Sequence, residues 1–357
     1  MKMKNVLIIF GGKSNEYGVS LKSASAVIDN IDKEKYNLMM IGITEEGKWL
    51  RFNGTTDEIR NNTWFNHKDC KEAFISPCRS HKGFIEINNY ETKIVKVDVV
   101  FPILHGKFGE DGTLQGLLEL SGIPFIGCKT LSSAICMDKA IAHNIVREAG
   151  IRVAKSLTIF EEDDSVIEKI KEKNMNTPLY IKPAKSGSSI GITRISNLCE
   201  LNEAIKKAFI HDNKVVIEEA VNGFEVGCAV LGQNNLIVGG VDEIELSRGF
   251  FDFNEKYTLE TSQIHAPARI SDIKAEEVRK TAIKIYKLLS CEGMARVDMF
   301  IDVNGDIFFN EVNTIPGFTG SSRYPKMMDL IGLSYTKLID KLIEVTLINE
   351  LVETPSI

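Results

Sequence analysis

The apolar run Asn5–Phe10 (NVLIIF) constrains the fold of this chain more than any other feature. It ends at Gly11-Gly12 and lacks the alternation of a half-exposed strand, which is typical of a parallel strand buried on both faces. Apolar residues at helical spacing follow from about Ser20 (SLKSASAVIDNI). A strand, a glycine turn and a helix begin a doubly wound α/β unit, in which ligands bind beyond the carboxyl ends of the strands. The sequence therefore predicts an α/β fold with a site in the loops that follow strands.

Two polar residues lie in such loops. Glu16 is in the loop GGKSNEYGVS after the first strand, and His105 directly follows the apolar segment Val97–Leu104. We expect both side chains at one rim of the sheet, because the carboxyl ends of parallel strands meet there. The loop is not G-x-G-x-x-G, so a dinucleotide site is not indicated. A solvated carboxylate and a structural histidine remain competing interpretations.

The middle of the chain predicts a phosphate-binding loop. The strand Pro178–Lys182 leads into PAKSGSSIGIT, whose glycines and serines supply backbone N–H and hydroxyl donors beside Lys182. This is not a P-loop, and a polar β-turn is the alternative interpretation. The helix predicted over 131–149 contains Lys139, for which a solvated position is the default. Glu218 and Glu225 flank an Asn-Gly turn, where ordinary surface carboxylates are the alternative to nucleotide contacts.

A predicted hairpin over Met294–Phe318 carries the clearest sign of chemistry. MARVDMFID and DIFFNEV alternate in polarity around an Asn-Gly turn signal. Alternation places Arg296 and Asp298 on one face, and Glu311 and Asn313 on one face of the partner strand. Two carboxylates and an amide oxygen suit Mg²⁺, which completes its coordination with water and substrate phosphates. A solvated hairpin face is the alternative.

Composition limits the class of protein. The 357 residues indicate two or three domains at ~100–200 residues each. The net charge of −6 and the lack of a long basic run argue against a nucleic-acid partner. No apolar stretch approaches the ~18 residues of a membrane span, and the seven cysteines form no C-x-x-C pair. We therefore expect a cytoplasmic protein that has no membrane partner and contains reduced cysteines.

The segment 247–270 has no regular period. Long irregular loops inside compact domains are usually functional lids or disordered. Its aromatic residues favour an ordered lid: Phe250, Phe251, Phe253 and Tyr257.

Together these segments resemble one known family. The matching motifs occur in order over nearly the whole chain: GGKSNEYGVS, LHGKFGEDGTLQG, MDK at 137–139, IKPAKSGSSIG, IEEAVNGFEVGCAVLG, EKY at 255–257, ARVDMF and NEVNTIPGFTGSSRYP. They resemble the D-alanine–D-alanine ligases of the ATP-grasp superfamily, and most closely the vancomycin-resistance branch of VanG or VanC type.

The resemblance implies a three-domain ATP-grasp enzyme, with an N-terminal α/β substrate-binding domain over 1–138, a central α+β lid domain over 139–222 and a C-terminal α+β catalytic domain over 223–357. Such an enzyme uses ATP to form an acyl phosphate of one D-alanine, and the amine of a second D-amino acid then attacks it. The resemblance also implies two Mg²⁺ (or Mn²⁺) ions and a homodimer.

Site roles carry over motif by motif. ATP contacts are implied for Lys139, Lys182, Ser189, Glu218, Glu219, Ala220, Val221 and Glu225. Metal binding is implied for Asp298, Glu311 and Asn313. Catalytic roles are implied for Glu16, Ser188, Tyr257, Arg296 and Gly317, with Arg296 and the Gly317 N–H at the oxyanion. Contacts with the amino acids or the transferred phosphate are implied for His105, Lys256, Ser322 and Arg323.

Two motifs bear on the second substrate. D-alanine–D-lactate ligases replace the segment around Tyr257 with a His-bearing one, so the EKY motif favours an amine nucleophile. Arg323 follows Ser322 where D-alanine–D-alanine ligases usually have an apolar residue. The combination resembles ligases that use D-serine, and a polar pocket accommodates a hydroxyl better than an apolar one. We therefore predict a D-alanine–D-serine ligase.

Three alternatives remain at this point. The first is a D-alanine–D-alanine ligase of normal cell-wall synthesis. The second is another ATP-grasp carboxylate–amine ligase, which the set Glu16, His105 and Tyr257 disfavours. The third is a nucleotide-binding regulator with an inactive site, which predicts the loss of a metal ligand or of Arg296, and all of these are present.

Overall fold

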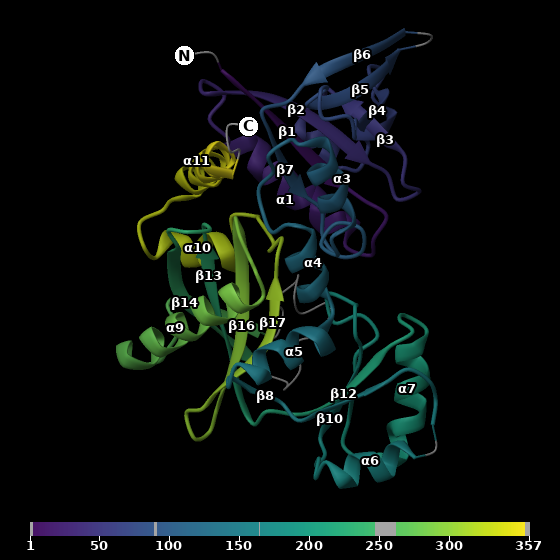
Figure 1. Ribbon diagram of the computed structural model, residues 1–357, viewed down its shortest axis with the longest axis vertical. Helices are drawn as coiled ribbons and strands as arrows, with labels where there is room; N and C mark the ends of the chain where they lie inside the picture. The colour runs from purple at the N-terminus through teal and green to yellow at the C-terminus, as the bar shows by residue number, and fades with distance from the viewer. Residues whose placement is uncertain (1–2, 89–90, 164, 247–261, 354–357) are drawn as a thin grey trace.

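Three β-sheets organise the computed structural model, which describes residues 3–88, 91–163, 165–246 and 262–353. Figure 1 shows an N-terminal unit at the top, a central unit at the lower right and a C-terminal unit at the lower left. The predicted lid residues lie outside the described residues: Phe250, Phe251, Phe253, Lys256 and Tyr257. Among the described helices, none is both long and apolar enough to cross a membrane.

The N-terminal sheet is built around the predicted first strand. β1 (Lys4–Gly11) pairs in parallel with β2 (Tyr36–Ile43) and β7 (Val99–Ile103), and Val6 through Phe10 are fully buried. Antiparallel strands extend the sheet beyond β2: β3 (Trp49–Phe52), β4 (Lys71–Ile75), β5 (Gly83–Asn88) and β6 (Glu91–Lys96). Beyond β7, Phe125 forms an isolated parallel bridge to Val100.

The first helix begins earlier than its apolar period suggests. α1 (Tyr17–Asn30) starts three residues before Ser20 because the Tyr17 ring is buried and its hydroxyl accepts a hydrogen bond from Trp64 Nε1 at 3.0 Å. Glu16 therefore occupies the N-cap position of α1. The other helical segments of this unit are α2 (Thr56–Arg60), η1 (Trp64–Asn66) and α3 (Thr113–Ser121).

The single helix predicted over 131–149 is wrong. The structure has α4 (Thr130–Met137) and α5 (Lys139–Glu148), separated by Asp138 in an extended conformation with φ −90° and ψ 98°. The Asp138 carboxylate caps α5 by accepting the Ile141 N–H at 3.2 Å. The Lys139 N–H donates to the Ala184 carbonyl at 3.1 Å. Lys139 thus starts a new helix, where its side chain points away from solvent.

The central sheet is antiparallel, in the order β11-β10-β12-β9. Its strands are β9 (Ser156–Ile159), β10 (Leu179–Pro183), β11 (Thr193–Ile195) and β12 (Val215–Glu219). Its helices cover one face through a shared apolar core: α6 (Val166–Glu172), η2 (Leu198–Glu200) and α7 (Leu201–Phe209). The opposite face is thereby left to line a cavity.

The C-terminal sheet contains the predicted hairpin at its centre. Its order is β15-β14-β13-β16-β17-β8, and its strands are β8 (Arg152–Val153), β13 (Gly223–Leu231), β14 (Ile237–Leu246), β15 (Ser262–His265), β16 (Met294–Asp302) and β17 (Ile307–Asn313). β14 ends just before the segment 247–270 that was predicted to be irregular, and β15 lies within that segment, so the prediction is wrong for residues 262–265. α9 (Asp272–Leu288) and α5 contribute to the core of this unit.

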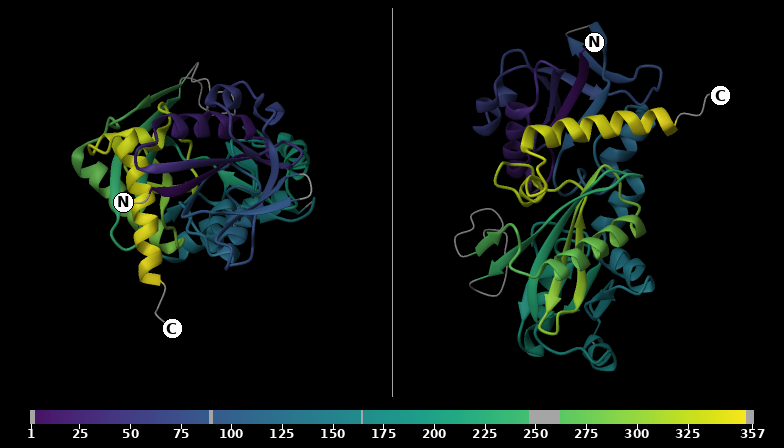
Figure 2. Two further views of the ribbon diagram at one scale, coloured as in Figure 1. Left: turned by 90° about the horizontal axis from the view of Figure 1, so that it is seen from above. Right: turned by 90° about the vertical axis from the view of Figure 1, so that its left-hand side faces the viewer.

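The C-terminal helices return to the N-terminal unit. After α10 (Arg323–Asp329), α11 (Tyr335–Glu353) runs across that unit in the right-hand view of Figure 2. Leu338 and Leu342 of α11 share one apolar cluster with Val6 and Phe101. This packing fixes the loop between β17 and α10 against the rim that carries Glu16 and His105. The domain bounds remain predictions.

Candidate active site

Two cavities lie at the contacts between the three units. One, of about 510 Å³, separates the central sheet from the C-terminal sheet, and its lining includes all eight residues predicted to bind ATP. The other, of about 480 Å³, lies between the N-terminal and C-terminal units. Its lining includes every described residue predicted for the metal, the amino acids and catalysis: Glu16, His105, Ser188, Arg296, Asp298, Glu311, Asn313, Gly317, Ser322 and Arg323. Lys139, Glu225 and Glu311 line both cavities, so the two sites meet at these residues.

The hairpin register brings the predicted metal residues together. Arg296 pairs with Asn313 and Asp298 with Glu311, followed by a register shift between Asp298 and Met299. Asp298 is only 1% exposed; it accepts hydrogen bonds from Arg296 Nε at 2.8 Å and from Asn313 Nδ2 at 2.9 Å. Burial disfavours the charge of Arg296, but Asp298 outweighs this effect and raises the Arg296 pKa.

This donor set fits a magnesium ion. In the described residues no group of three or more His, Cys, Asp or Glu side chains forms a closed metal cage. Two carboxylates, Asp298 and Glu311, lie opposite each other beside the Asn313 amide. Mg²⁺ needs few protein ligands because water and phosphate oxygens complete its octahedron. The open set therefore matches a metal bound together with a phosphorylated substrate.

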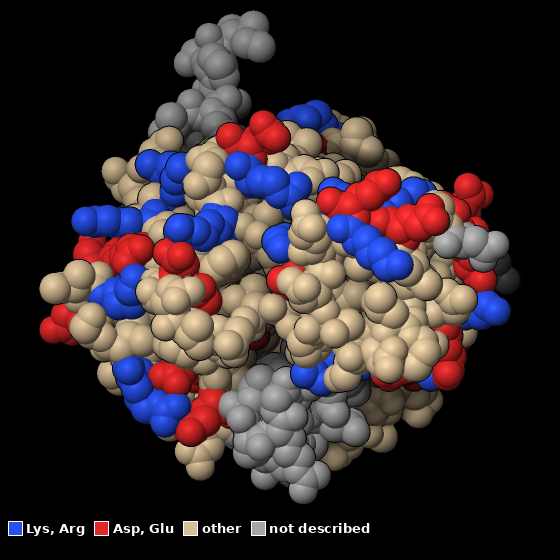
Figure 3. All heavy atoms as spheres, turned by 90° about the horizontal axis from the view of Figure 1, so that it is seen from below, with Lys and Arg blue, Asp and Glu red and all other residues tan. Residues whose placement is uncertain are grey.

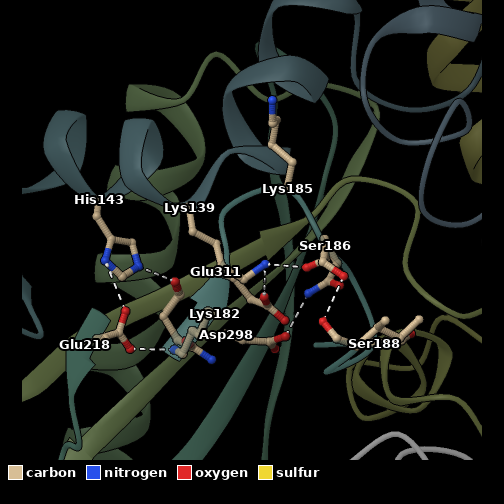
Figure 4. Close-up of polar contacts among 12 residues, drawn as sticks. Lys139, His143, Lys182, Lys185, Ser186, Ser188, Glu218, Asp298 and Glu311 are labelled. Carbon is tan, nitrogen blue, oxygen red and sulfur yellow. Dashed lines mark hydrogen bonds and ion pairs between the residues drawn. The ribbon is translucent and has the colours of Figure 1, made fainter. Parts of the chain in front are cut away.

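Lys139 links the two cavities. Its ammonium donates to the Ser186 carbonyl at 2.8 Å and lies 3.5 Å from Glu311 Oε2 (Figure 4). Because α5 starts at this residue, the side chain points to the junction of the two cavities. A solvated position was the default expectation for Lys139 in one continuous helix, and the structure does not have it. A cation at the junction suits phosphates that pass from one cavity to the other.

Lys182 is another cation on the lining of the 510 Å³ cavity, which we call the nucleotide cavity after its predicted ligand. It donates from Nζ to Glu218 Oε1 at 2.6 Å, and both side chains are buried. Its position on β10 follows from alternation, since Ile181 packs into the apolar core and Lys182 faces the opposite side. Glu218 pairs with Tyr180 in the neighbouring strand. The pair places an ammonium on the lining of this cavity.

A loop of the N-terminal unit and a loop of the central unit meet at Glu16. The Ser188 hydroxyl donates to Glu16 Oε1, and Ser188 has a φ of +50° within its turn. A Cβ at Gly106 would lie 2.4 Å from Glu16 Oε2, and a Cβ at Gly187 would lie 2.8 Å from the same atom. Only glycine permits this approach of both loops to the carboxylate. The predicted contact of Glu16 and Ser188 is therefore present, while Tyr257 lies outside the described residues.

The loop that carries Gly317 is held by the N-terminal unit. His105 Nδ1 donates to the Ile315 carbonyl at 2.9 Å, and its Nε2 lies 3.2 Å from Ser23 Oγ. Ser23 Oγ accepts the Phe318 N–H at 3.2 Å. These contacts position the Gly317 backbone in the cavity, and a direct contact of His105 with a substrate carboxylate stays a prediction.

Glu110 joins the same network and was not predicted as a site residue. It accepts the Gly106 N–H at 2.7 Å and the Ile315 N–H at 3.0 Å. Burial raises the pKa of Glu110 to about 8, and the nearby Glu16 charge adds to the shift. The only sign of a role for Glu110 in the sequence was its place in the motif LHGKFGEDG. The motif alone does not reveal that Glu110 accepts a hydrogen bond from the Ile315 N–H.

Arg323 lies beside Asp298, one of the predicted metal residues. Its guanidinium makes two hydrogen bonds to Asp242, from Nε at 2.7 Å and from Nη2 at 2.8 Å. It also donates to Glu225 Oε1 at 2.8 Å and lies 3.3 Å from Asp298 Oδ1. Ser322 Oγ accepts the Thr319 N–H at 2.9 Å at the edge of the cavity. Arg323 thus lines the cavity and contacts the carboxylates of Asp242, Glu225 and Asp298. Its role toward the second substrate stays a prediction.

Family models match both halves of the chain. The model described as the D-Ala D-Ala ligase N-terminus matches residues 5–128, and the one described as the D-Ala D-Ala ligase C-terminus matches residues 145–344. The chain belongs to the D-alanine–D-alanine ligase family. The predicted α/β ATP-grasp fold and the predicted family are thereby confirmed.

The relatives of this chain include proteins described as D-alanine–D-alanine ligases and one described as a D-Ala:D-Ser ligase. The chain is 44% identical to the D-alanine–D-alanine ligase of Caldicellulosiruptor bescii over 353 residues, covering 97% of this chain and 96% of that protein. It is 54% identical to the crystal structure of the VanG D-Ala:D-Ser ligase from Enterococcus faecalis, with a TM-score of 0.89 and coverage of 97% and 100%. A D-alanine–D-alanine ligase from Bacillus anthracis complexed with ATP is 29% identical, with a TM-score of 0.73 and coverage of 98% and 100%.

Proposed function

We propose that this ligase joins D-alanine to D-serine at the expense of ATP, making a dipeptide for modified peptidoglycan precursors in vancomycin resistance. The supporting observation is the 54% identity, over 97% of the chain, to a structure described as a D-Ala:D-Ser ligase. A D-alanine–D-alanine ligase is the alternative, supported by the 44% identity to the Caldicellulosiruptor bescii enzyme.

The nucleotide cavity suits ATP. In the proposal, backbone groups of residues 219–221 and the carboxylates of Glu218 and Glu225 bind adenine and ribose, while Ser189 contacts the phosphates. Lys139, at the junction of the two cavities, and Lys182, within the nucleotide cavity, would neutralise the phosphates. Phosphoryl transfer is catalysed mainly by positioning and by neutralising charge, and two buried lysines supply both.

Metal ions would be held by Asp298, Glu311 and Asn313. Bound there, two Mg²⁺ ions would neutralise phosphate charge near the transferred group. The chain's own contribution is the paired register of β16 and β17, which aligns these side chains before any ligand arrives. Preorganised ligands reduce the ordering that binding requires.

The amino acids would occupy the second cavity. Glu16 would pair with the ammonium of the first D-alanine, and a carboxylate oxygen of that substrate would attack the γ-phosphorus of ATP to give D-alanyl phosphate and ADP. The amine of the second substrate would then attack the carbonyl carbon and release inorganic phosphate and a proton. The loop of Gly187 and Ser188 would exclude water, which otherwise hydrolyses the acyl phosphate.

Arg296 and the Gly317 N–H would stabilise the oxyanion formed in that attack. Both line the second cavity, and the network of His105, Glu110 and Ser23 holds the loop of Gly317. Loss of one such donor typically removes ~3–4 kcal/mol of transition-state stabilisation.

The second substrate would be selected near Ser322 and Arg323. Ser322 would contact its carboxylate, and Arg323 makes the region polar enough for a hydroxyl. Lys256 and Tyr257 remain predicted contributors in the undescribed segment.

The activity can be tested by measuring phosphate release with ATP, Mg²⁺ and D-alanine, with and without D-serine. The proposal predicts faster release and a D-alanyl-D-serine product when D-serine is present. Equal or faster turnover with D-alanine alone would favour the alternative ligase.

The remaining predictions concern location and assembly. A cytoplasmic location and a homodimer stay predictions, as does the lack of a nucleic-acid partner. The face drawn in Figure 3 carries Lys and Arg interspersed with Asp and Glu, which offers no continuous cationic surface there.

A further inference from the structure

His143 lies behind the nucleotide cavity and has no role in the function proposed above. It is on α5, one helical turn after Lys139, and its side chain is buried with 3% exposure. Figure 4 shows its ring between Glu218 and the strand that carries Glu311. Nothing in the sequence distinguishes it from an ordinary buried histidine.

A hydrogen bond of the His143 side chain defines which ring nitrogen carries a proton. Nε2 lies 2.7 Å from the Asn310 carbonyl oxygen. A carbonyl oxygen can only accept, so Nε2 is protonated and donates. In a neutral imidazole the other nitrogen, Nδ1, then carries a lone pair. This lone pair faces Glu218 Oε2 at 3.7 Å.

The two facing atoms are not satisfied. Within the described part of the chain, His143 Nδ1 and Glu218 Oε2 are both buried and have no hydrogen-bond partner. A lone pair opposite a carboxylate oxygen is unfavourable, whereas a proton on Nδ1 would join them as an ion pair. The pair is therefore a buried site for one proton.

Lys182 determines whether that proton is needed. Its ammonium balances Glu218 through the 2.6 Å hydrogen bond to Oε1. The groups that face His143 are Glu218 on β12, Lys182 on β10, Arg147 on its own helix, and the Asn310 carbonyl and Phe309 ring on β17. Burial lowers the pKa of His143, and Glu218 only partly opposes this effect, so the ring is neutral near pH 7 while Lys182 stays in place.

We propose that nucleotide binding is coupled to the uptake of one proton by the His143–Glu218 pair. The inference rests on the proposed function, because it requires Lys182 to move from Glu218 toward a phosphate. That movement would leave a buried carboxylate without its cation, which is strongly unfavourable. A proton from solvent on Nδ1 restores the balance and keeps Glu218 ionised and oriented toward the cavity. His143 is thus a positioning residue for nucleotide binding.

The direction of the pH dependence follows from comparing the free protein with the nucleotide complex. The His143 pKa is below its usual value in the free protein and rises when Lys182 leaves, so binding takes up a proton between the two pKa values. Within that window nucleotide affinity increases as the pH falls, by up to about tenfold per pH unit for one proton.

Calorimetric titration with magnesium adenylyl imidodiphosphate tests the coupling directly. Titrations at pH 7 in two buffers of different ionisation enthalpy give the number of protons bound. We expect greater uptake in the wild type than in His143→Gln, which keeps an N–H donor but does not titrate. His81→Gln removes an imidazole that contacts Ser76 in the N-terminal unit and should behave like the wild type. Proton binding by the nucleotide itself cancels in the comparison.

Each outcome bears on a different claim. Equal proton uptake by the wild type and His143→Gln, with both binding the nucleotide, would overturn the inference and leave the proposed function intact. Failure of the wild type to bind the nucleotide would overturn the proposed function and the inference with it. Should His143→Gln not fold, NMR titration of the wild-type His143 ring with and without nucleotide decides the question. A raised pKa in the complex supports the coupling, and an unchanged one refutes it.

Discussion

Replacing Arg323 with leucine should destabilise the protein strongly. The guanidinium makes two hydrogen bonds to Asp242, one to Glu225 and an ion pair with Asp298. Asp242 is fully buried and Asp298 is only 1% exposed. Arg323→Leu would leave Asp242 without its buried cation, while Asp298 would keep its contact with Arg296.

The expected loss follows from this burial. Breaking a buried ion pair by removing one partner typically costs ~3–5 kcal/mol, because the remaining charge is uncompensated. Arg60 provides a matched comparison, since it also contacts two carboxylates, Asp29 and Asp57, but its side chain is 43% exposed. Exposed pairs contribute about 0–1 kcal/mol, so Arg60→Leu should have little effect.

Urea denaturation of the wild type and both variants measures the difference in the free energy of unfolding. Adding Asp242→Asn to Arg323→Leu should recover part of the loss, since one buried charge is then removed. An Arg323→Leu variant as stable as Arg60→Leu would refute the structural role of the cluster.

Three further predictions concern the site. Asp298→Ala should abolish ATP turnover while circular dichroism shows a retained fold, and near-normal turnover would exclude Asp298 as a metal ligand. Gly187→Ala should lower kcat at least tenfold, because its Cβ would lie 2.8 Å from Glu16 Oε2; unchanged kinetics would show that the loop does not approach Glu16 as described. Glu110 has a folded-state pKa of about 8, above its usual value, so the folded protein holds an extra proton between about pH 4.5 and 8. The wild type should therefore lose stability relative to Glu110→Gln as pH rises through that range, and parallel pH–stability curves would contradict the assignment.

The local sequence pattern predicted those elements that depend on the spacing of polar and apolar residues and on turn residues. The β16–β17 hairpin, with Asp298 opposite Glu311, follows from polar residues at alternate positions around an Asn-Gly turn. The buried strand β1 follows from its unbroken apolar run. The family resemblance predicted the site residues, and those that the structure describes line the two cavities.

Features set by tertiary contacts were not predictable in the same way. The break at Asp138 depends on the capping of α5 and on the Lys139 N–H reaching Ala184, whereas helical periodicity continues through the sequence. The pair of Arg323 and Asp242 joins residues 81 positions apart. The contact of His143 with Glu218 likewise depends on how α5 packs beside the central sheet.

A competition between D-alanine and D-serine as the second substrate tests the proposed function. The enzyme is supplied with ATP, Mg²⁺ and equal concentrations of D-alanine and D-serine, and the two dipeptides are resolved chromatographically. We expect D-alanyl-D-serine as the main product. D-alanyl-D-alanine as the main product across the pH range would contradict it.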